Sequence, residues 1–289
     1  VEAEAERPRR TPGRIPSLSA TAPVGPDTLD VPTVFLVHGL GRRPASLAPM
    51  GRGLVAAGFD VVNFGYPSWT GEADSLVAML SDTIAACCAD RVHEVNFVTH
   101  SLGGILVRKY LQDQSLEHRG RVVMLAPPNG GSEIIDFVQT VPGLRALLGP
   151  IGSALGTDST SLPNTLGPAQ FELGVITGDR SLNPIYSWLI PGPDDGKVSV
   201  ESAIVPGLDQ FLVVPFSHSF VMNREEVLDE IMTFLATGSF SQAALEAWAY
   251  SPDDSTTIDP DSVDVLPDSQ SIGRDSADAA ASSSVASHG

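Results

Sequence analysis

A serine in a predicted strand-to-helix turn is the residue of this sequence best suited to chemistry. An apolar run ends at Thr99-His100-Ser101-Leu102-Gly103-Gly104, and a segment with helical spacing follows it. Small residues flank the serine two positions away on each side, at Thr99 and Gly103. A nucleophile elbow needs this pattern, because its sharp turn strains the backbone of the nucleophile and brings the flanking positions close together. We therefore predict that Ser101 is a covalent nucleophile.

A serine hydroxyl is a weak nucleophile, so Ser101 needs a general base. The base is usually a histidine, and after an elbow of this kind it follows the acid in the chain. His118 lies in a polar helix-end segment and His288 lies in the C-terminal tail. His218 directly follows the apolar run 211–216, where a loop after the last strand would carry the base. His218 is the predicted base, and a solvated loop histidine is the alternative.

Three aspartates compete for the role of the acid that orients this base. The segment Asp194-Asp195-Gly196-Lys197-Val198 falls between the last two expected strands, and Gly196 permits a tight turn there. Asp195 precedes that glycine and is the predicted acid. Asp179, which ends the preceding strand, is its main rival, and Asp194 is the third candidate. Either rival could instead be a turn or helix-cap carboxylate.

The negative oxygen of a tetrahedral intermediate needs preset hydrogen-bond donors. One donor is expected from the backbone N–H of Leu102, the residue after the nucleophile. The second is expected from the loop His38-Gly39-Leu40-Gly41, whose glycines let the Leu40 N–H point inward. His38 is expected to support that loop by packing or hydrogen bonding, and His100 is expected to pack beside Ser101.

Alternating strands and helices are expected to position these residues. The expected strands are residues 33–38, 59–66, 92–99, 120–126, 172–177 and 211–216, and the expected helices are residues 47–58, 72–90, 102–114 and 220–235. Strands that are apolar along almost their whole length and are separated by helices predict an α/β fold, with a mostly parallel sheet covered on both faces.

A segment at about 129–170 interrupts this alternation. It contains two apolar stretches, 134–138 and 144–148, which proline and glycine divide. We expect a short helical cap or lid above the carboxyl ends of the strands. The alternative is a set of ordinary packing helices at the sheet edge.

The composition divides the chain into three parts. Residues 1–30 are rich in Pro, Arg, Thr and Ser and are expected to form a flexible arm, and residues 31–250 are expected to form the folded domain. Residues 251–289 contain eight Asp, one Arg and no aromatic residue. Such a tail cannot bury enough apolar area to offset its ordering entropy, so we expect it to be disordered.

The net charge of −18 argues against nucleic acid or anionic lipid headgroups as the main partner. No run of 18 apolar residues occurs, so no transmembrane segment is expected. The two cysteines, Cys87 and Cys88, are adjacent in a predicted helix and are expected to be buried, inert thiols. The sequence leaves open whether the protein is secreted or cytoplasmic.

The motifs together resemble the α/β-hydrolase superfamily, and within it the bacterial lipase and esterase branch. The resemblance covers residues 31–235 and rests on His38-Gly39-Leu40-Gly41, the elbow around Ser101, Asp195-Gly196-x-Val198 and His218. Residues 64–68 and 126–132 are also similar to segments of that branch. Thr99 departs from the pattern, because the commonest elbow has glycine at that position.

The resemblance implies an α/β-hydrolase fold and the hydrolysis of carboxylic esters through an acyl-enzyme. It implies no cofactor, and it leaves calcium binding open, since no residue is assigned as a metal ligand. A small-molecule or lipid ester is the expected substrate, with transient contact to a lipid interface through the cap. A thioesterase, an acyltransferase or a polyester depolymerase would use the same residues. A non-catalytic scaffold on this fold is the remaining alternative.

Overall fold

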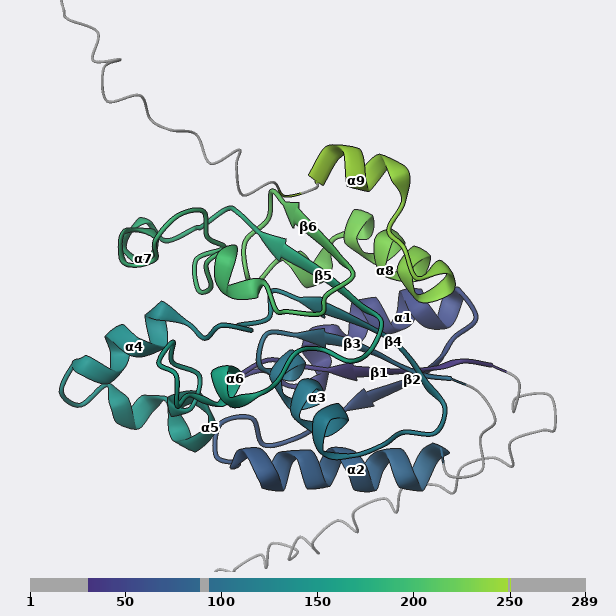
Figure 1. Ribbon diagram of the computed structural model, residues 1–289, viewed down its shortest axis with the longest axis horizontal. Helices are drawn as coiled ribbons and strands as arrows, with labels where there is room; N and C mark the ends of the chain where they lie inside the picture. Colours follow the sequence, from purple (N-terminus) through teal and green to yellow (C-terminus); the bar gives the residue numbers. More distant parts are fainter. Residues whose placement is uncertain (1–30, 89–93, 249, 251–289) are drawn as a thin grey trace, which may run out of the picture. The chain divides into compact units, whose positions relative to one another are not determined.

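A computed structural model describes residues 31–88, 94–248 and 250, all within the compact unit Val1–Tyr250. The predictions of a flexible arm at 1–30 and a disordered tail at 251–289 lie outside the described residues. The described part is an α/β structure with a central sheet between two layers of helices (Figure 1).

The sheet has six strands, and every neighbouring pair is parallel. The strands are β1 (Thr33–Val37), β2 (Asp60–Phe64), β3 (Val95–His100), β4 (Arg119–Leu125), β5 (Leu173–Gly178) and β6 (Gln210–Val214). Their order is β2-β1-β3-β4-β5-β6. The predicted parallel sheet is confirmed, and each expected strand is present with ends shifted by a few residues.

Two apolar cores lie on the two faces of this sheet. Along β1, Phe35 and Val37 belong to one core, and Val34 and Leu36 belong to the other. This alternation follows from the two-residue period of a strand, and it explains why β1 is apolar throughout. A central strand of a covered parallel sheet has no face left for polar residues.

Helices cover both faces (Figure 1). The helices α2 (Ala73–Cys88) and α3 (Leu102–Asp113) pack on the core with Phe35, and α1 (Ala48–Ala56) and α8 (Glu225–Thr237) pack on the core with Leu36. The expected helix at 47–58 begins as the 3₁₀ turn η2 (Pro44–Leu47), and the 3₁₀ turn η5 (Val221–Asn223) precedes α8. The helix α9 (Gln242–Trp248) was not predicted; it packs near β6.

The segment between β4 and β5 forms a short helical cap. It contains α4 (Glu133–Thr140), η3 (Arg145–Leu147), α5 (Gly149–Ser153) and α6 (Leu162–Thr165). A second excursion that the sequence did not predict contains α7 (Pro184–Leu189) and η4 (Glu201–Ala203), between β5 and β6. The helices α4 and α7 are in contact, so the cap and this second excursion meet.

The strand order places a crevice between β1 and β3. From β1 the chain moves outward to β2, returns past β1 to β3, and then continues in the opposite direction to β6. In such sheets ligands bind outside the carboxyl ends of the strands where the direction reverses. The register pairs Val37 with Thr99, so the loop after β1 and the turn after β3 leave the sheet side by side.

The prediction of buried, free thiols is wrong. Cys87 and Cys88 form a disulfide with each other, and both are half-buried against the core. They occupy the last two positions of α2. None of the described helices is long and apolar enough to cross a membrane.

Candidate functional site

A pocket of about 280 Å³ opens at the crevice between β1 and β3. Its walls come from the β1 loop, the elbow, the cap, α7 and the loops that precede and follow β6. The lining residues are Leu40, Arg42, Trp69, His100, Ser101, Pro128, Ser132, Ile134, Ile135, Leu148, Leu155, Tyr186, Lys197, Val198 and His218. The pocket therefore joins Ser101 and His218 to an apolar wall supplied largely by the cap.

Ser101 occupies a strained turn between β3 and α3. Its φ is 53° and its ψ is −123°, a conformation that costs a non-glycine residue about 1–3 kcal/mol. The turn needs close approach on both sides. A Cβ at Gly103 would clash with the Val37 carbonyl oxygen, and one at Gly39 would lie 3.1 Å from the Ser101 Cβ. The elbow geometry predicted from the sequence is thus present.

Asp195 and His218 form a buried hydrogen-bonded pair. The distance from Asp195 Oδ2 to His218 Nδ1 is 2.7 Å, and the two side chains are 0% and 5% exposed. The other oxygen, Oδ1, accepts hydrogen bonds from the Lys197 and Val198 amides, each at 2.9 Å. The His218 amide also donates to the Asp195 carbonyl oxygen at 2.9 Å. The carboxylate is therefore held at both oxygens, and His218 is bonded to Asp195 through its ring and through its backbone.

The two rival aspartates have other partners. Asp194 Oδ1 accepts from the Gly196 amide at 2.7 Å and from Ser187 Oγ at 3.2 Å, which closes the acid loop. Asp179 lies 3.4 Å from Arg180 Nε and is a third exposed. Among the three candidates, the geometry brings Asp195 to the histidine.

Leu40 and Leu102, the two predicted oxyanion donors, lie on the two segments that meet at this pocket. Leu40 lines the pocket, and Leu102 is the first residue of α3, directly after Ser101. The first N–H groups of a helix have no partner within it. No backbone acceptor outside the helices and strands is recorded for either amide in the described part of the chain. The oxyanion role of both residues stays a prediction.

His38 supports the β1 loop. Its ring is fully buried, stacks on Tyr66 with centroids 4.2 Å apart, and makes a 3.1 Å hydrogen bond from Nδ1 to the Gly39 carbonyl oxygen. The Tyr66 hydroxyl donates to the His38 carbonyl oxygen. Tyr66 was not singled out by the sequence; the only signal was its place in the 64–68 segment.

His100 holds the loop that carries His218. Its Nε2 lies 2.9 Å from the His218 carbonyl oxygen, and the two rings are 4.9 Å apart. A carbonyl only accepts, so Nε2 carries the proton. Burial, and then the neighbouring charges of His218, Arg42 and Lys197, hold the pKa of His100 well below its usual 6.5. His100 is therefore neutral and acts on the His218 loop through this bond.

The buried histidines predict that the protein loses stability in mild acid. Burial lowers the pKa of His38 as well as that of His100. Below pH 6.5 the unfolded chain binds protons that the folded chain excludes, so the free energy of unfolding falls as the pH falls. The slope is at most about 1.4 kcal/mol per pH unit for each histidine.

Urea unfolding at a series of pH values between 8 and 5 measures this slope. We expect His100→Asn to have a shallower slope than the wild type. The same substitution at exposed His118 is the matched control. Equal slopes in the wild type and His100→Asn would contradict the account.

The cap and the acid loop are tied together by polar contacts that the sequence did not predict. Ser132 Oγ donates to the Lys197 carbonyl oxygen at 2.8 Å. Glu133 Oε1 accepts from Ser199 Oγ at 2.8 Å and from Ser202 Oγ at 3.2 Å. The start of α4 thereby fixes the loop that presents Asp195.

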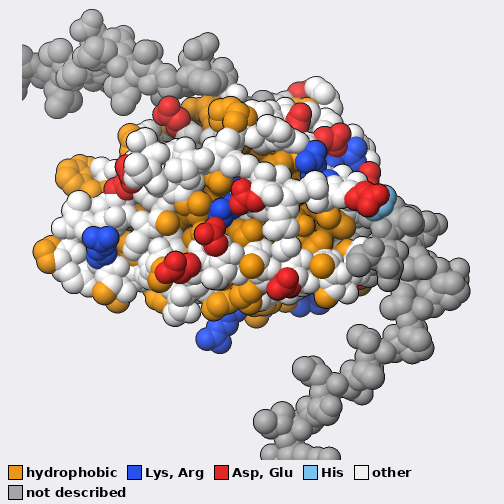
Figure 2. All heavy atoms as spheres, turned by 60° about the horizontal axis from the view of Figure 1, so that its bottom comes forward, with side chains coloured by type: hydrophobic (Ala, Val, Ile, Leu, Met, Phe, Trp, Pro, Cys, Tyr) orange, Lys and Arg blue, Asp and Glu red, His pale blue; other side chains and the backbone are white. Residues whose placement is uncertain are grey.

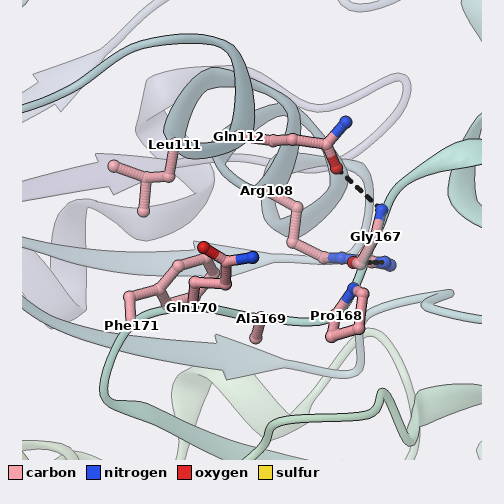
Figure 3. A pocket seen from close by; sticks show the side chains of 8 residues that line it. All are labelled: Arg108, Leu111, Gln112, Gly167, Pro168, Ala169, Gln170 and Phe171. Carbon is pink, nitrogen blue, oxygen red and sulfur yellow. Dashed lines mark hydrogen bonds between the residues drawn. The ribbon is translucent and has the colours of Figure 1, made fainter.

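A second pocket, of about 180 Å³, lies between α3 and the segment that precedes β5 (Figure 3). There the Arg108 guanidinium donates to carbonyl oxygens of Asn129, Leu166 and Gly167, and Gln112 Oε1 accepts from the Gly167 amide at 2.7 Å. Burial lowers the pKa of Arg108 to about 10. These bonds fasten the end of the cap to α3. The residues that line this pocket include no Ser, Cys or His.

No family model and no curated protein matches the chain. Among solved structures, the mature lipase BlEst2 of Bacillus licheniformis is similar with a TM-score of 0.58 and 16% identity, over 73% of this chain and 93% of that one. The phospholipase PlaB of Legionella pneumophila gives 0.54 and 17%, over 72% of this chain and 57% of that one. This chain thus spans little more than half of PlaB.

At these identities the similarity concerns the fold. It agrees with the parallel six-stranded sheet covered by helices. The chain has the α/β-hydrolase fold, as these bacterial lipases do.

Proposed function

We propose that the protein is a serine hydrolase that cleaves carboxylic esters with Ser101, His218 and Asp195. The observation that carries this proposal is the buried Asp195–His218 hydrogen bond of 2.7 Å at the wall of the pocket that contains the strained Ser101. The fold shared with solved bacterial lipases supports the same class of reaction.

The hydrogen bonds assign the proton positions. Asp195 Oδ1 already accepts two amide hydrogens, and Oδ2 accepts from His218 Nδ1. An imidazole whose Nδ1 carries the hydrogen leaves Nε2 free to take the Ser101 proton. Asp195 then stabilises the imidazolium that forms.

The reaction proceeds in two steps. Ser101 Oγ attacks the ester carbonyl, and the N–H groups of Leu40 and Leu102 stabilise the negative oxygen of the tetrahedral intermediate. His218 passes its proton to the leaving alcohol, which gives an acyl-enzyme on Ser101. Water, deprotonated by His218, attacks the acyl group and releases the acid, so the enzyme regains its starting state without a cofactor.

The apolar wall of the pocket suits the acyl chain. Ile134 and Ile135 from α4 line it together with Leu148 and Leu155 from the cap. An acyl chain in contact with these side chains loses water from apolar surface, which contributes roughly 0.8 kcal/mol for each buried CH₂ group. The cap is therefore expected to set the preferred acyl length.

The outer surface of the cap and α7 suits contact with a lipid interface. Trp188 and Ile185 are 84% and 67% exposed on α7, and Leu147 is 58% exposed on the cap. Hydrophobic side chains protrude at the left end of Figure 2, where α4 and α7 lie in Figure 1, with few charged side chains among them. Exposed apolar residues beside a pocket are typical of an interaction surface. We include this contact in the proposed function.

Hydrolysis of p-nitrophenyl esters of increasing acyl length tests the proposal. We expect turnover of at least one ester and covalent labelling by a fluorophosphonate probe, which reacts with activated serines. Prior labelling should abolish turnover in proportion to the fraction labelled. Turnover without any labelling would contradict the proposal, and so would the absence of both turnover and labelling.

The same panel separates the alternatives and tests the interface. A matched thioester and an insoluble polyester cover the other acyl chemistries, and added alcohol acceptors detect acyl transfer. If lipid contact assists catalysis, activity on a long-chain ester should rise once its concentration exceeds its solubility. A smooth saturation curve through that limit would exclude the lipid contact and leave the hydrolase proposal intact.

A further inference from the structure

Two cationic side chains line the pocket of Ser101, and the recorded lining includes no carboxylate. Arg42 follows the β1 loop, and Lys197 lies in the acid loop. The chain has 35 acidic residues against 17 basic ones, and Lys197 is one of only two lysines. The charge of the pocket lining is therefore opposite in sign to the net charge of the chain.

Hydrogen bonds fix both residues in place. Arg42 Nη2 donates to Ser219 Oγ at 2.8 Å, beside His218, and the Arg42 carbonyl oxygen accepts from Ser68 Oγ at 3.3 Å. The Lys197 amide donates to Asp195 Oδ1 at 2.9 Å. The Lys197 carbonyl oxygen accepts from Ser132, as described above. The Arg42 guanidinium and the Lys197 backbone are thus bonded to the segments that present the histidine and the acid.

In the described part of the chain, carboxylates neutralise the charge of the other lysine, Lys109, but not the charges of Arg42 and Lys197. Lys109 lies 3.1 Å from Asp74 and 2.9 Å from Asp113. Within the described residues no ion pair is recorded for Arg42 or Lys197. Among the described residues, Asp195 is the acid whose charge raises the pKa of Lys197, and its carboxylate is bonded to the histidine.

The two cations repel each other across the pocket. The Lys197 side chain is solvent-exposed, but the protein around it removes part of its hydration, which lowers its pKa. The charge of Arg42 lowers this pKa further. Both charges also lower the pKa of His100, which places them close to the residue before Ser101. Such an arrangement costs free energy in the empty pocket, and a bound anion would offset that cost.

We propose that the ester cleaved at Ser101 carries a carboxylate or phosphate group, and that Arg42 and Lys197 bind this group beside the scissile bond. This inference rests on the proposed ester hydrolysis and names its substrate class. Arginine binds either anion through two parallel hydrogen bonds, and lysine adds a point charge.

Pairs of esters that differ in one charged group test this inference. One pair is 4-nitrophenyl hydrogen glutarate against 4-nitrophenyl pentanoate, which places a carboxylate on the acyl side. The other is dibutyryl phosphatidic acid against dibutyryl glycerol, both kept below aggregation, which places a phosphate on the alcohol side. In at least one pair we expect the wild type to have a kcat/KM about tenfold or more higher for the anionic ester.

The ratio of the two kcat/KM values is then measured in variants. Arg42→Gln and Lys197→Gln should each lower the ratio about tenfold, mainly through KM for the anionic ester. Arg43→Gln, which removes a neighbouring exposed charge outside the pocket, should keep the wild-type ratio. Added salt should lower the wild-type ratio, because it screens the attraction.

The outcomes separate this inference from the hydrolase proposal. A wild type without preference in either pair, or an unchanged ratio in both variants, overturns the anionic substrate even if neutral esters are hydrolysed at Ser101. Absence of Ser101-dependent hydrolysis of every ester overturns the proposed function itself. The pair that shows the preference identifies the carboxylate or the phosphate as the anion.

Discussion

Replacing Ser101 with alanine is expected to lower kcat for p-nitrophenyl esters on the order of 10⁴-fold or more, with the fold retained. The substitution removes only Oγ, so no acyl-enzyme can form, while His218, Asp195 and both oxyanion donors stay in place. Steady-state kinetics and fluorophosphonate labelling measure the effect. Ser81→Ala on α2, outside the recorded lining of the pocket, is the matched control and should keep full activity. Turnover by Ser101→Ala near the wild-type rate would overturn the assignment.

The backbone strain at Ser101 allows a second test, which measures stability and not activity. Glycine tolerates a φ of 53° that costs serine or alanine about 1–3 kcal/mol. Ser101→Gly should therefore be inactive, yet more stable than Ser101→Ala in thermal unfolding. If the glycine variant is the less stable of the two, the elbow does not store the strain that its backbone angles indicate.

The sequence predicted the sheet well, because its information is local. The six strands were recognisable as short apolar runs, and their separation by helices required parallel pairing. The elbow was recognisable for a similar reason. The close approach at Gly103 restricts the residue type two positions after Ser101, so the local sequence carries this constraint.

The sequence predicted less where the contacts join distant segments. The stacking of Tyr66 on His38, the ring of His100 against the His218 carbonyl, and the bond from Ser132 to Lys197 each connect residues 28 or more positions apart. Single residues of common types carry these contacts, and no local pattern marks them. The cationic pair of Arg42 and Lys197 was missed because its two members come from different loops and meet only in the folded chain.

The sequence alone could not decide which of three aspartates is the acid. Sequence spacing favoured Asp195 but left Asp179 and Asp194 open, because each stands near a strand end or a turn. What separates them is direction: Asp195 reaches His218 Nδ1, Asp179 pairs with Arg180, and Asp194 closes the acid loop. The orientation of a side chain depends on the turn of the whole loop, which the spacing of residues does not specify.

Replacing Asp195 with asparagine is expected to lower kcat about 10⁴-fold, close to the effect of removing the nucleophile. The amide can still accept the Lys197 and Val198 hydrogens, so the loop should keep its shape. Its NH₂ group, however, would face His218 Nδ1 and donate to it. The histidine would then carry its proton on Nε2, the nitrogen that must accept the proton of Ser101.

Asp179→Asn and Asp194→Asn are the matched variants, since each removes one carboxylate charge without changing size. The acid is the residue whose loss is severe, and we expect the other two variants to stay within about tenfold of the wild type. Asp194→Asn should keep its melting temperature close to that of the wild type, because the amide oxygen can still accept the Gly196 amide hydrogen in the acid loop. A severe loss in Asp179→Asn together with an active Asp195→Asn would transfer the role to Asp179. A loss confined to Asp195→Asn, at unchanged melting temperature, can come only from the state of the histidine and not from the loop that holds it.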